Sequence, residues 1–158
     1  MSRRGFMYLK RIRKDGTMKT LNVLIVDGQG GGIGRQLVEE IKNSRLPCRI
    51  TAVGTNTAAT AAMLKAGAEQ GATGENAAAV CCRDADVIMG PVGIAIADSL
   101  LGEITPGIAL AVGQSRARRL LLPVNHCQNV IVGVPDLSVR ALTADAVRIL
   151  GEWVSEEE

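Results

Sequence analysis

Aromatic side chains are scarce in this chain of 158 residues, which contains one Phe, one Tyr and one Trp. Such a sequence has few rings with which to stack on a base or to anchor a partner protein. Its hydrophobic content of 47% consists mainly of Ala, Val, Ile and Leu. A chain of this length and composition is expected to bury a core without needing disulfides.

Cysteine is also sparse, and there is no CxxC spacing among the four positions Cys48, Cys81, Cys82 and Cys127. No secretory signal is recognisable before them, so we expect free buried thiols in a reducing cytoplasm, and no metal site. The longest apolar stretch, residues 87–112, is interrupted by Asp98 and Glu103. No run therefore approaches the ~18 residues of a transmembrane helix, and no membrane contact is predicted for the folded domain.

An excess of basic charge is confined to one short stretch. Residues 1–18 carry six Lys and Arg side chains against one Asp, whereas the net charge of the whole chain is only +2. The remainder is slightly acidic, which argues against nucleic acid as a partner, because a polyanion is held mainly by clustered Lys and Arg. We predict a disordered basic extension over residues 1–18 and a single domain over 19–158. An arm that touches RNA or anionic lipid is the alternative for residues 1–18.

Strand and helix patterns alternate from Leu21 onward. Residues 21–26 are a nearly continuous run of Leu, Val and Ile, as in a strand buried on both faces. Ile33, Leu37 and Ile41 then recur four residues apart among charged residues, which predicts an amphipathic helix. The same reasoning predicts strands at 49–53, 86–90, 120–122 and 130–134, and helices at 57–66, 73–83, 94–101, from 105 onward and at 139–153.

This order predicts an α/β fold, a Rossmann-like three-layer sandwich of about five mostly parallel strands with helices on both faces. Too few residues separate 120–122 from 130–134 for a crossover helix, so these strands form an antiparallel edge or the first of them is short. The helix predicted at 94–101 is apolar nearly all round, which favours a homo-oligomer. Its Asp98 would then be buried at a subunit contact or would face the ligand site.

A glycine-rich turn joins the first strand to the first helix, and it reads Asp27-Gly28-Gln29-Gly30-Gly31-Gly32-Ile33-Gly34. The start of a helix leaves about four backbone N–H groups unpaired, and the helix dipole adds about half a positive charge there. Glycines let an anion approach such a turn without meeting a Cβ atom. We therefore predict that residues 28–34 bind a phosphorylated ligand. A tight turn whose glycines only permit close packing is the alternative.

The glycine spacing fits a GxxxGxG pattern at Gly28, Gly32 and Gly34, which resembles the cofactor loop of short-chain dehydrogenases. That resemblance implies NAD(P) or another nucleotide as the cofactor. Two features depart from such a dehydrogenase. Thr55 and Asn56 stand near the position where a carboxylate would bind the adenosine ribose. The resemblance also implies a Tyr and Lys pair for proton transfer, whereas the single tyrosine here, Tyr8, lies upstream of the fold. The Walker pattern is absent too, because no Lys-Ser or Lys-Thr follows the glycines.

Ligands of open α/β sheets collect at the carboxyl ends of the strands, where three further segments are expected to join the glycine turn. These segments are Gly54-Thr55-Asn56, Thr73-Gly74-Glu75-Asn76 and Gly90-Pro91-Val92-Gly93. Asp27 and Glu75 are the candidate acid–base residues. For Asp27, two alternatives are orienting the turn through its N–H groups and binding a metal together with the ligand. For Thr73 and Asn76, the alternative is simply to start a helix.

Six longer runs resemble one family, and they cover residues 26–35, 54–56, 63–68, 71–77, 90–94 and 99–106. Over roughly residues 19–135 the chain is similar to a small bacterial family that is catalogued as a domain of unknown function. The resemblance implies a Rossmann-like fold and the cytoplasm of a bacterium, and it implies no activity.

Three functions remain open on the sequence. The first is binding of a nucleotide or other phosphorylated metabolite, with regulation as one use of that binding. The second is an enzyme, either an NAD(P)-dependent reductase or an activity on phosphate esters or sugars, in which Asp27 and Glu75 supply acid–base chemistry. The third is a non-enzymatic assembly protein in which the glycine turn has no ligand.

Overall fold

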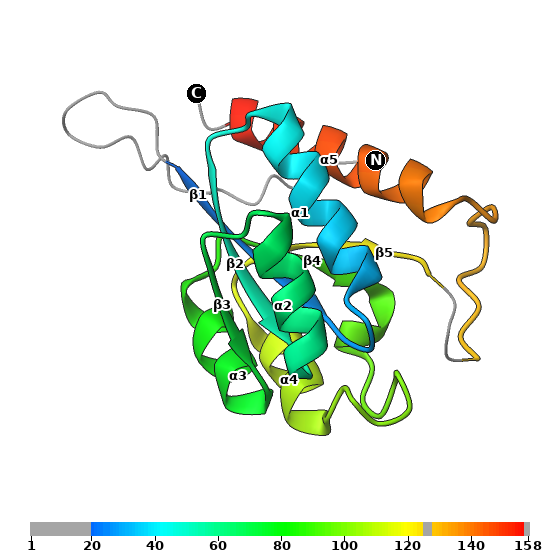
Figure 1. The fold of residues 1–158 in the computed structure, drawn as a ribbon. Helices are drawn as coiled ribbons and strands as arrows, with labels where there is room; N and C mark the ends of the chain where they lie inside the picture. Colours follow the sequence, from blue (N-terminus) through cyan, green and yellow to red (C-terminus); the bar gives the residue numbers. More distant parts are fainter. Residues whose placement is uncertain (1–19, 125–127, 157–158) are drawn as a thin grey trace.

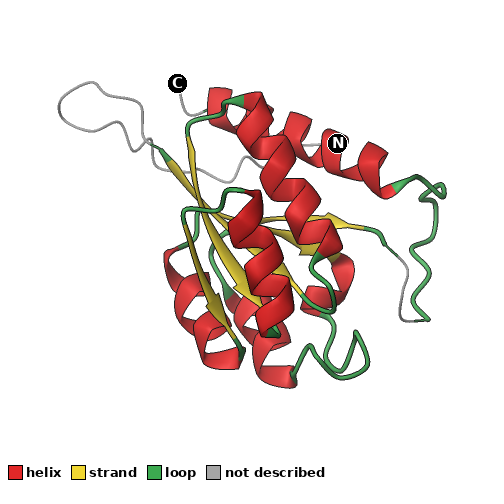
Figure 2. Cartoon of the chain, in the orientation of Figure 1, coloured by secondary structure: helices red, strands yellow, loops and turns green. Residues whose placement is uncertain are grey.

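Five parallel strands form one sheet at the centre of the protein (Figures 1 and 2). The computed structural model describes residues 20–124 and 128–156. The predictions for residues 1–18 and for Cys127 therefore lie outside the described residues. The strands lie in the order β3-β2-β1-β4-β5, and their bounds are β1 (Leu21–Asp27), β2 (Cys48–Gly54), β3 (Gln70–Thr73), β4 (Val87–Pro91) and β5 (Arg118–Leu122).

Helices cover both faces of this sheet, which confirms the α/β prediction. Buried side chains of α1 (Gly32–Ser44), α2 (Thr57–Ala66) and α5 (Val139–Ser155) pack on one face. Those of α3 (Glu75–Asp84) and α4 (Pro106–Gln114) pack on the other. Figure 1 shows α5 running beside α1, at the opposite end of the fold from α4. None of the helices described is both long and apolar enough to cross a bilayer.

The strand order creates a switch point between β1 and β4. The chain leaves β1 through α1 and adds β2 and β3 on one side, then returns through α3 to add β4 and β5 on the other. The connections after β1 and β4 therefore leave toward opposite faces of the sheet. In open α/β sheets such a point opens a crevice at the carboxyl ends of the strands, and ligands bind there.

The antiparallel edge is a prediction that the structure corrects. β5 pairs with β4 in parallel, and residues 130–134 form no strand. Val130 and Val132 are 79% and 92% exposed, so this apolar run has strand composition without a neighbour to pair with. The fifth strand is instead β3, whose sequence has little strand character and whose pairing with β2 is what makes it extended.

The helix predicted at residues 94–101 is also wrong. A short 3₁₀ turn, η1 (Val92–Ala95), is followed by a compact loop in which Asp98, Leu100 and Leu101 all have positive φ. Ile94 and Leu100 are buried within the chain, whereas Leu101 is 98% exposed and Asp98 is exposed too. The helix that favoured a homo-oligomer is therefore not formed, and the oligomeric state stays a prediction.

Local signals placed α4 correctly. Thr105 caps its N-terminus by accepting a hydrogen bond from the Ile108 amide at 3.2 Å, and Pro106 is the first helical residue. We expect Thr105→Ala to lower the free energy of unfolding by about 1 kcal/mol, because that amide loses its acceptor. Urea denaturation checks the value. Thr105→Ser keeps the hydroxyl and is expected to retain most of the wild-type free energy of unfolding. Equal losses of that free energy in both variants would contradict a capping role.

A cation–π contact joins the last helix, α5, to the edge strand β5. The Arg118 guanidinium of β5 lies 3.5 Å from the centre of the Trp153 ring of α5. Arg118 also pairs with Glu156, at 3.2 Å. This contact joins the carboxyl end of α5 to the start of β5, so the amino end of the helix lies toward the carboxyl edge of the sheet.

Candidate functional site

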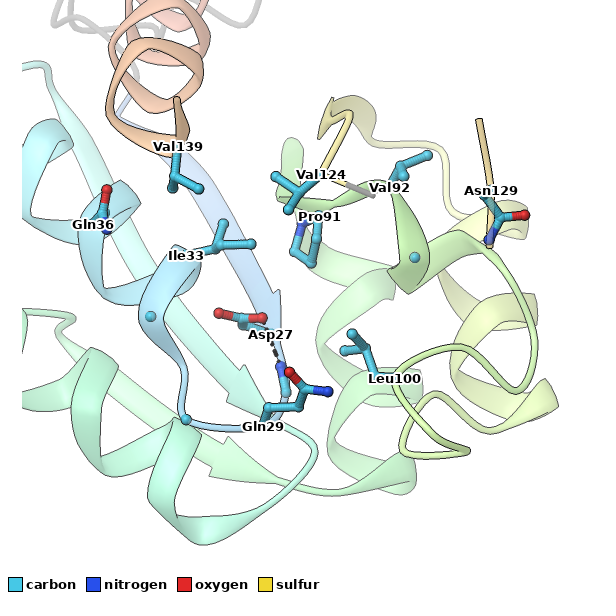
Figure 3. Close-up of a pocket in the computed structure, with 14 residues that line it drawn as sticks. Asp27, Gln29, Ile33, Gln36, Pro91, Val92, Leu100, Val124, Asn129 and Val139 are labelled. Carbon is cyan, nitrogen blue, oxygen red and sulfur yellow. Dashed lines mark hydrogen bonds between the residues drawn. The ribbon is translucent and has the colours of Figure 1, made fainter. Parts of the chain in front are cut away.

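A cavity of about 250 Å³ lies at the switch point, at the carboxyl ends of β1 and β4. Figure 3 shows Ile33 and Val139 on one side of it, Pro91 and Val124 on the other, and Asp27 below. Its walls are largely apolar, and no described Lys or Arg side chain lines it. The described lining residues are Asp27, Gly28, Gln29, Gly30, Gly32, Ile33, Gln36, Pro91, Val92, Gly93, Leu100, Val124, Asn129 and Val139.

Asp27 organises the glycine turn from beneath. Its buried carboxylate accepts hydrogen bonds from the amides of Gly28, at 2.8 Å, and Gly34, at 2.7 Å. The Gly31 amide donates to the Gly28 carbonyl at 2.9 Å. Gly31 and Gly34 belong to the start of α1 and their N–H groups are used within the protein, which leaves fewer free donors than the roughly four that a helix start ordinarily offers.

Glu103 reaches the same turn from the loop after η1. Its Oε2 accepts a hydrogen bond from the Gln29 amide at 2.7 Å, from the Thr55 hydroxyl and from Asn56 Nδ2 at 3.2 Å. Asn56 also donates to the Gln29 carbonyl at 2.8 Å. One carboxylate thus joins the glycine turn to the turn that follows β2. The sequence reasoning assigned no role to Glu103, although it lies in the 99–106 run that carries the family resemblance.

The glycines of the turn fall into two groups. A Cβ atom at Gly31 would lie 2.8 Å from the Ala59 backbone, and one at Gly34 would lie 2.5 Å from Met63 Sδ. At Gly28 it would lie 2.7 Å from Glu103 Oε2. Packing therefore explains these three glycines. A Cβ at Gly30 or Gly32 would meet nothing within 4 Å, and neither residue has the positive φ that favours glycine.

Gly30 and Gly32 are also the residues whose amides remain free. Within the described residues, neither N–H donates to a protein acceptor. Both residues are exposed and line the cavity. The two glycines that packing does not explain are therefore the two that present unused donors beside the start of α1.

The structure brings some of the predicted site residues to this cavity and leaves others outside it. Asp27, Gly28, Gln29, Gly30, Gly32, Ile33 and Pro91 line it. Gly31 and Gly34 support the turn from behind, and Gly90 precedes Pro91 within β4. Thr55 and Asn56 are held by Glu103. The lining does not include Thr73, Gly74, Glu75 or Asn76.

The residues after β3 have structural partners of their own. The Thr73 hydroxyl lies 2.7 Å from that of Thr60, and the Gly74 amide donates to the Gly54 carbonyl at 2.9 Å. Glu75 accepts a hydrogen bond from Thr105 at the start of α4. Because Asp27 lies under the glycine turn and Glu75 beside α4, the two carboxylates are occupied by different contacts.

Sequence reasoning missed five of the fourteen described residues that line the cavity. Gln36 follows the glycine turn by one helical turn, whereas Leu100, Val124, Asn129 and Val139 come from loops and a helix start far along the chain. Only the fold brings these segments to the end of β1. The serine that starts α5 was a usable local signal for Val139, because Ser138 accepts a hydrogen bond from the Ala141 amide and fixes where the helix begins.

The two carboxylates of the turn have pKa values shifted in opposite directions. Burial raises the pKa of Asp27, against the hydrogen bonds from the Gly34 and Gly28 amides. The Thr55 hydroxyl lowers the pKa of Glu103, assisted by the Gln29 amide and Asn56. No group of three His, Cys, Asp or Glu side chains among the described residues could hold a metal ion.

We expect carboxyl-carbon NMR titration to place Asp27 above the ordinary aspartate pKa and Glu103 below the ordinary glutamate pKa. The contributions of the two side chains to the free energy of unfolding therefore depend on pH in opposite directions. The contribution of Asp27 is fully present below its unfolded pKa and is lost as pH rises through its raised folded pKa. That of Glu103 is present above its unfolded pKa and is lost as pH falls through its lowered folded pKa. A lowered Asp27 pKa would mean that the hydrogen bonds to its carboxylate outweigh burial, and a raised Glu103 pKa would contradict the hydrogen bonds that Glu103 accepts.

Comparison with known proteins identifies a matching family and leaves the activity open. The family model described as "Domain of unknown function (DUF3842)" matches residues 22–155, which confirms the resemblance drawn from the sequence. No curated protein matches the chain significantly. Among solved structures, the chain is similar to the "crystal structure of AibC", with 20% identity, a TM-score of 0.40 and coverage of 92% of this chain. The match spans 43% of that structure, less than half of its length.

Proposed function

This chain belongs to the DUF3842 family, a domain of unknown function, and we propose that it binds a phosphorylated small molecule, a nucleotide being one candidate, between the glycine turn and β4. The single observation that carries the proposal is the state of Gly30 and Gly32. Both have free amides and open space, Gly32 is the first residue of the 13-residue helix α1, and Gly30 lies two residues before it. The N–H groups and the dipole at such a position favour an anion.

The shape of the cavity supports a compact ligand. Its volume of about 250 Å³ lies just below the ~300–1,000 Å³ of common ligand pockets. Ile33, Val124 and Val139 offer apolar contacts to the body of the ligand, and Gln36 and Asn129 offer polar ones. Because no described basic side chain lines the cavity, the charge of the ligand is met by backbone amides.

Binding is favoured over catalysis by the contacts of the two candidate acid–base residues. Asp27 is held by the amides of the turn and Glu75 by Thr105, so neither side chain is free to transfer a proton in this arrangement. A regulatory or carrier role fits a site of this kind.

Thermal-shift measurements test the proposal. AMP, ADP, NAD, NADP and sugar phosphates are added in turn, and a binder at a hundred times its dissociation constant adds about 2.7 kcal/mol of stability. We expect at least one monophosphate to raise the melting temperature, with the unphosphorylated nucleoside or sugar as the matched control. If no phosphorylated compound acts, the proposal is wrong. If only a nicotinamide cofactor raises the melting temperature, the result favours the reductase hypothesis over this proposal.

A further inference from the structure

The three donors held by Glu103 are of the kinds that bind phosphate oxygens. They are the Gln29 backbone amide, the Thr55 hydroxyl and the Asn56 carboxamide. They follow the ends of β1 and β2, next to the free amides of Gly30 and Gly32. A carboxylate oxygen and a phosphate oxygen accept hydrogen bonds in the same way. Glu103 thus occupies a second position suited to an anion, on the donors of Gln29 and of the turn after β2.

The backbone just before Glu103 adopts conformations that are energetically unfavourable for residues other than glycine. Asp98, Leu100 and Leu101 all adopt left-handed conformations, which non-glycine residues rarely adopt. Leu100 lines the cavity and packs where a Cβ at Gly28 would lie, and Ser99 anchors the loop through a hydrogen bond to the Ile96 carbonyl at 2.8 Å. Strain of this kind persists where the surrounding structure needs a particular placement, and it clusters at ligand sites.

From these contacts we infer that Glu103 is a specificity-determining residue that restricts the site to ligands with one compact anionic group. This inference rests on the proposed function. A diphosphate placed on Gly30 and Gly32 would bring its second phosphate to the Gln29, Thr55 and Asn56 donors, where the Glu103 carboxylate already lies and repels it. A dinucleotide meets the same obstacle, because its pyrophosphate needs both positions.

The test is an amide NMR titration with two simple probes, orthophosphate and pyrophosphate. In the wild type we expect both probes to shift the Gly30 and Gly32 resonances, with pyrophosphate bound no more tightly than orthophosphate. In Glu103→Ala we expect pyrophosphate to bind about tenfold more tightly than in the wild type, equivalent to about 1.4 kcal/mol. New shifts are expected at Gln29 and Asn56, while orthophosphate affinity changes little.

Two further variants keep the outcome decisive. Glu103→Gln removes the charge and preserves the side-chain volume. A gain in pyrophosphate affinity in Glu103→Gln would show that the charge of Glu103 excludes the second phosphate. A gain only in Glu103→Ala would show that the volume of the side chain excludes it. Glu152→Gln, on the exposed face of α5, changes the net charge equally and is expected to gain nothing. An unchanged pyrophosphate-to-orthophosphate ratio in both Glu103 variants overturns the inference and leaves the proposed function standing. If neither probe shifts Gly30 and Gly32 in the wild type or in any variant, both the inference and the proposed function are overturned.

Discussion

Replacing Gly32 with Leu is expected to abolish binding of phosphorylated ligands and to leave the protein folded. A side chain at this position meets no protein atom within 4 Å of its Cβ, so the fold has room for it. That room is the space beside the Gly30 and Gly32 amides, which the ligand requires. We expect at least about a hundredfold loss of affinity, equivalent to about 2.7 kcal/mol. Calorimetric titration with the best ligand of the thermal-shift series gives the value.

Gly113→Leu is the matched control for this variant. Gly113 also lies on a helix, α4, is exposed, and has open space at its Cβ position, but it does not line the cavity. The two variants therefore add the same side chain, and only Gly32→Leu is expected to lose the ligand. Retained binding in Gly32→Leu, with circular dichroism like that of the wild type, would show that the site lies elsewhere.

Asp27→Ala is expected to lower the free energy of unfolding by about 2–3 kcal/mol, because two amides lose their acceptor and each unsatisfied donor costs about 1–3 kcal/mol. The amides are those of Gly28 and Gly34, and Asp27 itself is only 4% exposed. Removing the carboxylate also removes the cost of burying its charge, and water entering from the cavity replaces part of the loss. These two effects keep the expected value below the sum of two full penalties.

Urea denaturation of Asp27→Ala beside Asp145→Ala measures this difference. Asp145 pairs with Arg148 on the exposed face of α5, with both side chains 58% exposed, and its removal is expected to change stability by less than about 0.5 kcal/mol. Equal stabilities for the two variants would mean that Asp27 does not hold the turn together.

The parts of the fold that the sequence predicted are those with a local cause. The buried run of β1 and the Thr105-Pro106 start of α4 each depend on neighbouring residues, and each is confirmed. β3 was missed because it is extended by pairing with β2 and not by its own side chains. Residues 130–134 were predicted as a strand and form none, because β-branched side chains do not make a strand without a neighbouring strand to pair with.

The glycine turn was predictable as a strand-to-helix connection, but the use of its amides was not. Glu103 is 74 positions from Gln29, and no spacing rule connects two residues so far apart. The apolar composition of residues 94–101 suggested a helix, whereas Leu100 and Leu101 fold back in left-handed conformations to bring the next acidic residue to the turn. Val124, Asn129 and Val139, which follow β5 in the chain, meet the cavity only in the folded protein.

The stacking of Arg118 on Trp153 has a practical consequence for studying this protein. Trp153 is the single tryptophan of the chain, and it lies where α5 meets the edge strand β5. Its fluorescence therefore reports one event, the detachment of this helix from the sheet. Since Val139 at the other end of α5 lines the cavity, the same emission offers an intrinsic optical readout of whether ligand tightens the helix against the sheet.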